Sequence, residues 1–469
     1  MTASGPAFRP AALPKTGALP KPLNPQPGRL RPVPDGLLVP SLVGLYLFLY
    51  YSRVLDVSEL RRLHIPMVLL IILTLLALIQ GEGRRLFASR LGLAVVSLTG
   101  WVCFCLPFST WIGGSIESVK LALQSFAVFL VVVALVRSFE SWLKIAYAVG
   151  FSVAVAACLS FVFGKEVQGR VAFAEGINAD PNQFALVLLM GLPFLWLMAN
   201  RSTRFSAVRI FALLATVPVL VAFFRAGSRA GLLCLAAMAA VMFVHATPLQ
   251  KLKLAVLGII IAASAFVWLP SYLRVRFFTL FSTNVAMAEE LDEESLKYMG
   301  GDIGSTHGRR QLLEDGIRLT LRHPLFGVGP GQFAYRNWDE ARKRGQRRAS
   351  VVNHNTYVQY SSETGVAGFI AYSLALFFAL FDLLRIRRQA KLRAKTSRDY
   401  QQFVTASQYL IASVVSFAVG SFFLSLAYSI VVYSMFALVA AFCLTVRTVM
   451  AINNPRPAAA PAPRPAAGF

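Results

Sequence analysis

The sequence predicts an all-α integral membrane protein with about twelve transmembrane helices and one large, partly helical loop. Its residues are 56% hydrophobic and only 14% charged, whereas a soluble protein carries about a quarter of its residues as charged side chains. Apolar segments of about 20 residues, the length that crosses a bilayer as a helix, recur along the chain. Composition and spacing therefore favour a polytopic membrane protein and exclude a soluble enzyme.

The expected spans are separated by short polar connections, except for one long interruption between the ninth and the tenth. We predict spans near 37–54, 65–80, 91–108, 118–136, 145–163, 183–199, 207–224, 231–246, 253–269, 356–382, 404–426 and 429–449. Residues 37–269 thus carry the first nine spans, residues 270–355 form the large loop, and residues 356–449 carry the last three.

Basic residues in the short connections indicate the orientation, because Lys and Arg accumulate on the cytoplasmic side. With the N-terminus inside, the cytoplasmic connections include the strongly basic stretch 384–403, whereas the outer connection 109–117 has no Lys or Arg. The connection 55–64, with two arginines, is the main exception. We expect both termini in the cytoplasm and the 270–355 loop on the outer, periplasmic face.

Both ends of the chain are low in complexity. Residues 1–36 are rich in Pro and Ala with scattered basic residues, and they lack the apolar core of a signal peptide. Residues 450–469 are a second stretch rich in Pro and Ala. We expect both to be disordered tails, the first of them basic and cytoplasmic.

The net charge of +24 suits anionic lipid head groups or an anionic substrate. Nucleic acid is not an expected partner, because most basic residues stand in short connections between apolar segments. The five cysteines lie in apolar segments without the spacing of a disulfide framework or a metal site. The acidic run 289–294 suggests a divalent-cation site or, more commonly, a solvated stretch. We expect no metal and no other cofactor.

The 270–355 loop is too long for a simple connector and is strongly basic, which indicates an anionic substrate on this face. Residues 308–322 predict an amphipathic helix with Leu313, Ile317 and Leu321 on its apolar face. The GVGPGQF sequence that follows predicts a tight turn with no clear helix after it.

A histidine marks the point where this loop enters the tenth span. One interpretation of His354 is a general base that takes a proton from a hydroxyl, because an imidazole exchanges protons near neutral pH. Asn355 and Glu363 would support it, although Glu363 lies too far along the helix for a direct contact to be expected. The other interpretation is a structural histidine at a helix start, hydrogen-bonded to a backbone carbonyl.

Arginines at outer membrane edges are the second group of candidates. Arg225 and Arg229 lie four residues apart in RAGSRAG, and Arg170 lies in the outer connection that also holds Asp180. Such arginines often extend to lipid head groups. Several that converge would instead bind a diphosphate, because the guanidinium fork matches phosphate oxygens and neutralises their charge without a metal.

Four motifs together resemble the signature of the O-antigen ligase and O-antigen polymerase superfamily. They are ADPNQFA at 179–185, SRAG at 228–231, the block from Gly308 and Arg309 through HPLFGVGPGQF at 323–333, and H-N-x9-G-x-x-G from His354 and Asn355 to Gly365 and Gly368. The resemblance covers about residues 165–375.

This resemblance implies an enzyme of the bacterial inner membrane that transfers glycan from undecaprenyl diphosphate. By motif position, His354 would deprotonate the acceptor hydroxyl, while Arg229, Arg309 and Arg170 would bind the diphosphate. Asn355, Gly365 and Gly368 would support the site.

The acceptor stays open at this point. Polymerases of the superfamily join repeat units of an exopolysaccharide or O-antigen, ligases transfer a chain to the lipid A core, and relatives transfer glycan to protein hydroxyls. Ligases tend to carry two threonines after the final glycine, where this chain has Phe369 and Ile370, so a polymerase is slightly favoured. Other polysaccharide export proteins are candidate partners.

A transporter or flippase for lipid-linked sugars is the alternative from another class. Proton-coupled transporters usually keep acidic residues inside their spans, and the predicted spans have almost none.

Overall fold

The computed structural model describes residues 36, 38–167, 169–173, 178–203, 206–278, 293–345, 350–394 and 397–452, and for 167, 278, 293–307 and 452 it describes the backbone alone. The described chain is all-α, apart from one short antiparallel hairpin of β1 (Lys165–Val167) and β2 (Arg170–Ala172). The predicted fold class is confirmed.

Each predicted span forms a helix in the expected order. The helices are α1 (Leu38–Ser52), α2 (Ile65–Ile79), α3 (Arg90–Phe104), α4 (Ile112–Leu135), α5 (Phe139–Phe163), α6 (Pro181–Arg201), α7 (Ala207–Arg225), α8 (Arg229–His245), α9 (Pro248–Trp268), α13 (Thr356–Arg393), α14 (Arg398–Gly420) and α15 (Ile430–Ile452). The large loop contains α10 (Ser271–Phe278), α11 (Glu293–Arg322) and α12 (Phe333–Lys343), and short 3-10 turns η1 (Glu59–Leu63), η2 (Glu82–Ala88) and η3 (Leu106–Phe108) join the first helices.

Nine helices in the described part of the chain are long and apolar enough to cross a bilayer, or ten if η2 and α3, bent by 103°, form one span. Two more, α1 and α8, are apolar but only 15 and 17 residues long. The protein is therefore a multi-pass membrane protein, and the full count of twelve spans stays a prediction.

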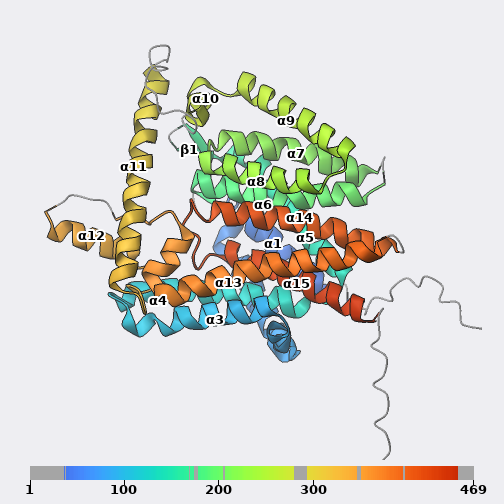
Figure 1. Ribbon diagram of the computed structural model, residues 1–469, viewed down its shortest axis with the longest axis horizontal. Coiled ribbons are helices and arrows are strands. Elements are labelled where there is room, and N and C mark those ends of the chain that lie inside the picture. Colours follow the sequence, from blue (N-terminus) through green and yellow to red (C-terminus); the bar gives the residue numbers. More distant parts are fainter. Residues whose placement is uncertain are drawn as a thin grey trace, which may run out of the picture. The chain divides into compact units, whose positions relative to one another are not determined.

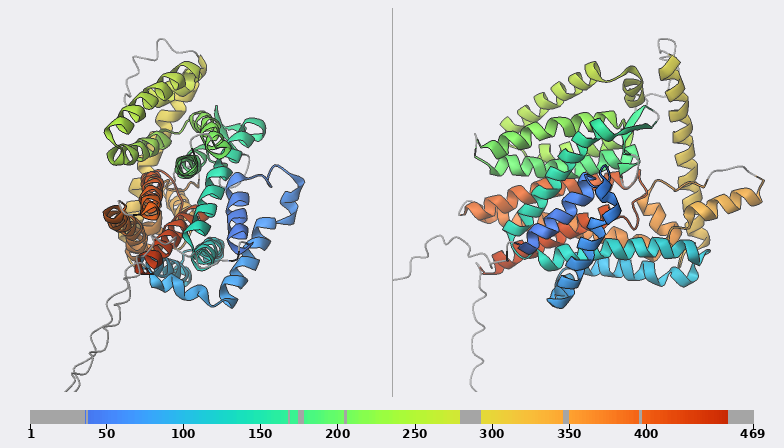
Figure 2. Two further views of the ribbon diagram at one scale, coloured as in Figure 1. Left: turned by 90° about the vertical axis from the view of Figure 1, so that its right-hand side faces the viewer. Right: turned by 180° about the vertical axis from the view of Figure 1, so that it is seen from behind.

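The buried centre of the bundle is formed by α6 and α15, whose apolar stretches are almost completely covered by other helices. α6 packs on α5, α7, α8 and α14, and α15 packs on α4 and α13. At the edge, α9 runs beside α7 and has no buried residue (Figures 1 and 2). An apolar helix without a protein cover is suited to contact with lipid.

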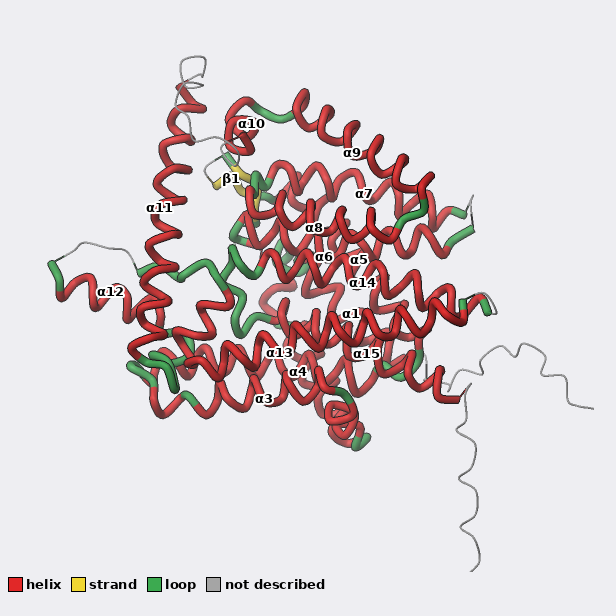
Figure 3. Tube along the Cα trace, in the orientation of Figure 1, coloured by secondary structure: helices red, strands yellow, loops and turns green. Residues whose placement is uncertain are grey.

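One end of the bundle carries the β1–β2 hairpin, α10, α11 and α12, and we call it the loop end. There α11 runs across the ends of the bundle helices rather than along them (Figure 1). Irregular backbone lies between α11, α13 and α14 at this end (Figure 3).

The predicted span 404–426 is too long, because α14 ends at Gly420. Residues 421–429 form a loop that packs on the start of α13, where the hydroxyl of Thr356 donates to the carbonyl of Leu424 at 2.6 Å. Leu424, Leu426, Ala427 and Tyr428 of this loop are buried, whereas Phe422 is 54% exposed. The apolar composition of residues 421–426 therefore led to a predicted span that continues past the true end of the helix.

The large loop differs from the prediction in the face that α11 buries. Leu319 is buried, whereas Ile317 and Leu321 of the predicted apolar face are 47% and 76% exposed. Glycine at Gly316 leaves room for α13 on the same side as Leu319. The close approach of α13 thus decides which face is buried, and the apolar spacing in 308–322 predicted the wrong one.

The GVGPGQF turn leads directly into α12, contrary to the expectation that no clear helix follows. Phe333, the first residue of α12, is buried against Leu319 and Val328. This small cluster, separate from the bundle core, fixes the start of α12.

Some predictions fall outside the described residues. They are the tail 1–36 apart from its last residue, the tail from 453 onward, and Arg347 and Arg348 of the basic run in the loop. The acidic run 289–294 also lies outside the described side chains.

Candidate functional site

Three of the helices that begin at the loop end start in a sequence motif whose polar side chain caps the first turn. Asp180 caps α6, Ser228 caps α8 and Asn355 caps α13, each by accepting a hydrogen bond from a backbone N–H two or three residues further on. The caps belong to the ADPN, SRAG and HN motifs. Because a helix start carries partial positive charge, all three starts favour an anion at this end.

Arg170, in β2, holds two of these helix starts together. Its Nε donates to the carbonyl of Ala226 at 2.8 Å, and its Nη2 donates to Oδ1 of Asn182 at 2.8 Å. The hydroxyl of Ser228 donates to the same Oδ1 at 2.9 Å. The ADPN and SRAG motifs are thus joined through one amide oxygen and one buried guanidinium.

Four arginines interact electrostatically here, and we call them the arginine cluster: Arg170, Arg229, Arg276 and Arg309. Burial, followed by repulsion from the other three, lowers the pKa of Arg276 to about 9. Burial also lowers the pKa of Arg170 to about 10, partly offset by Asp180. Buried positive charge of this density stabilises a bound anion.

Arg276 was not singled out from the sequence. It lies in α10, where its Nε donates to the carbonyl of Gly227 at 2.7 Å. Its signal in the sequence is its position seven residues after the ninth predicted span, which ends at 269. This is a membrane-edge position like those of Arg225 and Arg229. Only the fold shows that α10 turns back over the start of α8.

The structure places Arg225 apart from the arginine cluster. Its Nη2 pairs with Glu166 at 3.5 Å, and its guanidinium lies over the ring of Phe161 at 6.0 Å. The four-residue spacing from Arg229 does not bring the two side chains together, because α7 ends at Arg225 and α8 begins at Arg229.

His354 lies beside the cluster, immediately before the cap of α13. Its backbone has a φ of 52°, and its N–H donates to Oγ of Ser425 at 2.9 Å. Burial and then the charge of Arg309 lower the pKa of His354 below 6.5, while Asp180 opposes the shift. Within the described residues the imidazole makes no hydrogen bond, so the interpretation as a carbonyl-bound histidine is not supported there.

The two residues expected to support His354 contact other groups. The side chain of Asn355 caps α13. The carboxylate of Glu363 is buried and accepts from the N–H groups of Gly331 (2.8 Å) and Phe333 (3.4 Å) and from the hydroxyl of Tyr428 (2.8 Å). Glu363 therefore fixes the glycine-rich turn, and its effect on the histidine is through the fold.

Gly365 of the H-N-x9-G-x-x-G motif lies at a break in the backbone of α13. Gly365 has a φ of 73°, and the interrupted backbone pairs with the glycine-rich turn: the N–H of Val328 donates to Ser362 and that of Val366 to Pro324, at 2.9 and 2.8 Å. A side chain at Gly365 would meet the backbone of the turn. The motif thus encodes a backbone junction as well as the histidine.

Replacing Glu363 by Ala is expected to destabilise the protein by about 3–5 kcal/mol, because three buried donors lose their shared acceptor. The thermal unfolding midpoint in detergent measures the effect. Glu314→Ala, which removes a carboxylate exposed on α11 and paired with Arg310 at 3.1 Å, should leave the midpoint nearly unchanged. Equal midpoints for the two variants would contradict this role of Glu363.

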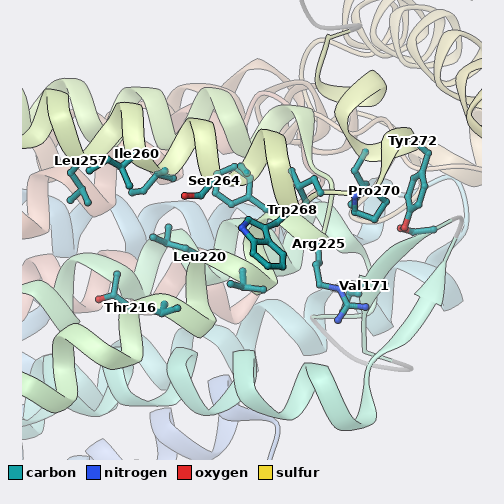
Figure 4. A pocket seen from close by; sticks show the side chains of 18 of the residues that line it. Val171, Thr216, Leu220, Arg225, Leu257, Ile260, Ser264, Trp268, Pro270 and Tyr272 are labelled. Atoms are coloured by element: carbon teal, nitrogen blue, oxygen red, sulfur yellow. The ribbon is translucent and has the colours of Figure 1, made fainter. Parts of the chain in front are cut away.

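A cavity of about 920 Å³ lies between α7 and α9 and reaches the loop end. Its walls are apolar, with Leu220, Leu257 and Ile260 among them, and Trp268 projects into it (Figure 4). At the loop end it is lined by Arg225 and by residues that flank the arginine cluster, namely Gly169, Val171, Tyr272 and Leu273. An apolar cavity thus ends beside a cationic site.

The sequence profile of the family described as O-antigen ligase matches residues 214–373. Residues 214–373 match an O-antigen ligase domain. This domain contains Arg229, Arg276, Arg309 and His354, whereas Arg170 lies in the preceding part of the chain. No curated protein matches the sequence at a significant level.

In the described residues, no group of three or more His, Cys, Asp or Glu side chains stands close enough to hold a metal ion. The structure thus brings together the predicted residues Arg170, Arg229, Arg309 and His354. It adds Arg276 and leaves Arg225 and Glu363 outside the cluster.

Proposed function

We propose that the protein is a membrane glycosyltransferase that uses a glycan linked to undecaprenyl diphosphate as its donor. The observation that carries the proposal is the position of the arginine cluster and His354 at the end of a large apolar cavity. A lipid-linked diphosphate has this same sequence of parts: an apolar tail, two phosphates and a sugar.

The donor would lie with its isoprenoid tail in the cavity between α7 and α9. Its diphosphate would bind the arginine cluster, where guanidinium groups and the starts of α6, α8 and α13 all favour negative charge. Arg225, paired with Glu166 on the cavity wall, would lie along the lipid rather than on the phosphates. The sugar would then lie toward His354.

The reaction follows from this placement. The neutral imidazole of His354 takes the proton of the acceptor hydroxyl, whose oxygen attacks the anomeric carbon of the donor sugar. The bond from that carbon to the diphosphate oxygen breaks, and the diphosphate leaves with the electron pair. The arginine cluster stabilises the leaving charge. A single displacement inverts the anomeric centre, which NMR of the product linkage tests.

The lowered pKa of His354 predicts the pH at which kcat/KM falls on the acid side. The imidazole must be neutral to accept a proton, so kcat/KM should be level near pH 7 and fall only below pH 6.5. Arg309→Gln removes a charge that lowers this pKa, so the acid limb should move upward toward 6.5. Initial rates between about pH 5 and 8 measure both positions. An unmoved limb would contradict the electrostatic contact between the two residues.

The acceptor is the part of the function that needs a direct experiment. Purified protein is reconstituted with an undecaprenyl-diphosphate repeat unit, alone or with lipid A core or an acceptor protein. We expect glycan ladders from the donor alone, as a polymerase of exopolysaccharide or O-antigen produces, since Phe369 and Ile370 replace the threonines of ligases. Product only with lipid A core would mean a ligase, and product only with protein an oligosaccharyltransferase.

The same experiment tests the competing class. Movement of the lipid-linked sugar across the bilayer without any product would indicate a transporter and overturn the proposal. In the cell we place the protein in the bacterial inner membrane, with cytoplasmic termini, a periplasmic large loop and other polysaccharide export proteins as partners.

A further inference from the structure

A row of aromatic side chains lies on the outer part of the loop end, away from the arginine cluster. It consists of Trp111, before α4, and of Tyr335 and Trp338 on α12, and we call it the aromatic row. Ring centroids are 5.6 Å apart from Trp111 to Tyr335 and 6.2 Å from Tyr335 to Trp338. Trp111 is 54% exposed and Tyr335 is 39% exposed, so the row presents ring surface to the surroundings.

The row is held in place from both sides. A Cβ at Gly114 would come within 2.6 Å of the Trp111 ring, so glycine there lets the indole lie on the first turn of α4. On α12 the helical period puts Tyr335 and Trp338 on the face opposite Glu340, which pairs with Arg322 of α11 at 3.2 Å. α11 therefore fixes α12 with the aromatic face turned away.

A cation completes the row at its far end. The guanidinium of Arg342 lies over the Trp338 ring, 5.4 Å from the centroid. This contact orders the indole, which is partly buried. Ordered aromatic rings at this spacing, two of them exposed, match the apolar C–H faces of successive sugar rings, which stack on aromatic side chains.

We propose that the aromatic row binds sugar units of the acceptor glycan chain, at a distance from the transfer site. The inference rests on the proposed glycosyltransferase function and deepens it. Along α11, Arg309 of the arginine cluster and Arg322, which pairs with Glu340 of α12, are separated by 13 residues, or about 20 Å of helix. The row thus lies apart from the arginine cluster, so it would favour extension of chains that have already begun to grow.

Anchoring in the lipid interface is the alternative use of such aromatic residues. An interfacial helix lies in the plane of the membrane. α12 instead projects outward from the loop end, roughly parallel to the bundle helices (Figures 1 and 2). α11, by contrast, runs across the ends of those helices (Figure 1). Tyr335 and Trp338 thus extend the row away from the ends of the spans, which favours a glycan over the bilayer.

Binding is tested without turnover, by tryptophan fluorescence of purified protein in nanodiscs titrated with maltohexaose, cellohexaose and chitohexaose. We expect quenching by at least one hexasaccharide, with affinity about tenfold weaker in Trp338→Ala and retained in Trp338→Phe. Leu321→Ala, which truncates a side chain 76% exposed on neighbouring α11, should behave as wild type. No quenching by any hexasaccharide, or equal quenching in Trp338→Ala, overturns the proposal. Quenching of Trp338 by brominated lipid in the nanodisc would show a bilayer anchor and also overturn it.

Product length provides the second measurement. With the lipid-linked donor, Trp338→Ala should form the first linkage at a rate within about twofold of wild type but give chains on average about threefold shorter, because longer chains dissociate sooner. An unchanged length distribution in Trp338→Ala would exclude the row as a chain-binding subsite while leaving the glycosyltransferase proposal intact. Absence of any product from wild type would count against the proposed function, and the fluorescence titration would still decide on the row.

Discussion

Replacing His354 by Asn is expected to lower the rate of glycan transfer about 10³-fold, because the acceptor hydroxyl loses the group that takes its proton. Donor binding should stay within about twofold, since the diphosphate is bound by the arginine cluster. Rates come from reconstituted protein with the lipid-linked donor, and donor affinity from binding of the radiolabelled lipid. A variant that transfers at the wild-type rate would remove His354 from the mechanism.

Asparagine is a better replacement than alanine, because His354 has a left-handed backbone conformation. His354 has a φ of 52°, a region that Asn tolerates better than Ala. Folding is therefore disturbed least while the imidazole is lost. His64 supplies the matched control: it is an exposed histidine with a φ of 46°, and His64→Asn should transfer glycan at the wild-type rate.

Replacing Arg309 by Gln is expected to lower kcat/KM about 10²-fold, because one charge that stabilises the leaving diphosphate is lost. Glutamine preserves much of the side-chain volume, so the effect reports charge. Initial rates at low donor concentration measure the change, at a pH on the level part of the wild-type profile.

The neighbouring residue gives the control for this variant. Arg310 has a side chain that is 81% exposed and pairs with Glu314 on the surface of α11. Arg310→Gln removes the same charge one residue away and should change kcat/KM by less than about twofold. Equal losses in both variants would mean that the basic loop attracts the donor in general, and that the arginine cluster has no special role.

The burial pattern of α11 and the end of α14 show what local sequence patterns miss. The spacing of Leu313, Ile317 and Leu321 indicated a helix correctly but pointed to the wrong face, because Gly316 admits α13 on the other side. Leu424, Leu426 and Tyr428, after the end of α14, are buried like helix residues, yet they belong to a loop that contacts the start of α13. The apolar character of a residue predicts that it is buried, but it does not predict which helix or loop covers it.

The sequence by itself determined the class of the protein, the order of its helices and the identity of most candidate residues. Apolar length specifies membrane helices, and His354 and Arg229 stand in short motifs at helix starts, where local capping chemistry can be recognised. The tertiary structure alone decided which of these residues meet. Arg170, Arg276 and Arg309 come from β2, α10 and α11, far apart along the chain, and they converge because the hairpin and the loop helices fold over the starts of α6 and α8. Long-range packing of this kind depends on the summed contacts of whole helices, so no single motif could have placed Arg276 in the arginine cluster or Arg225 outside it.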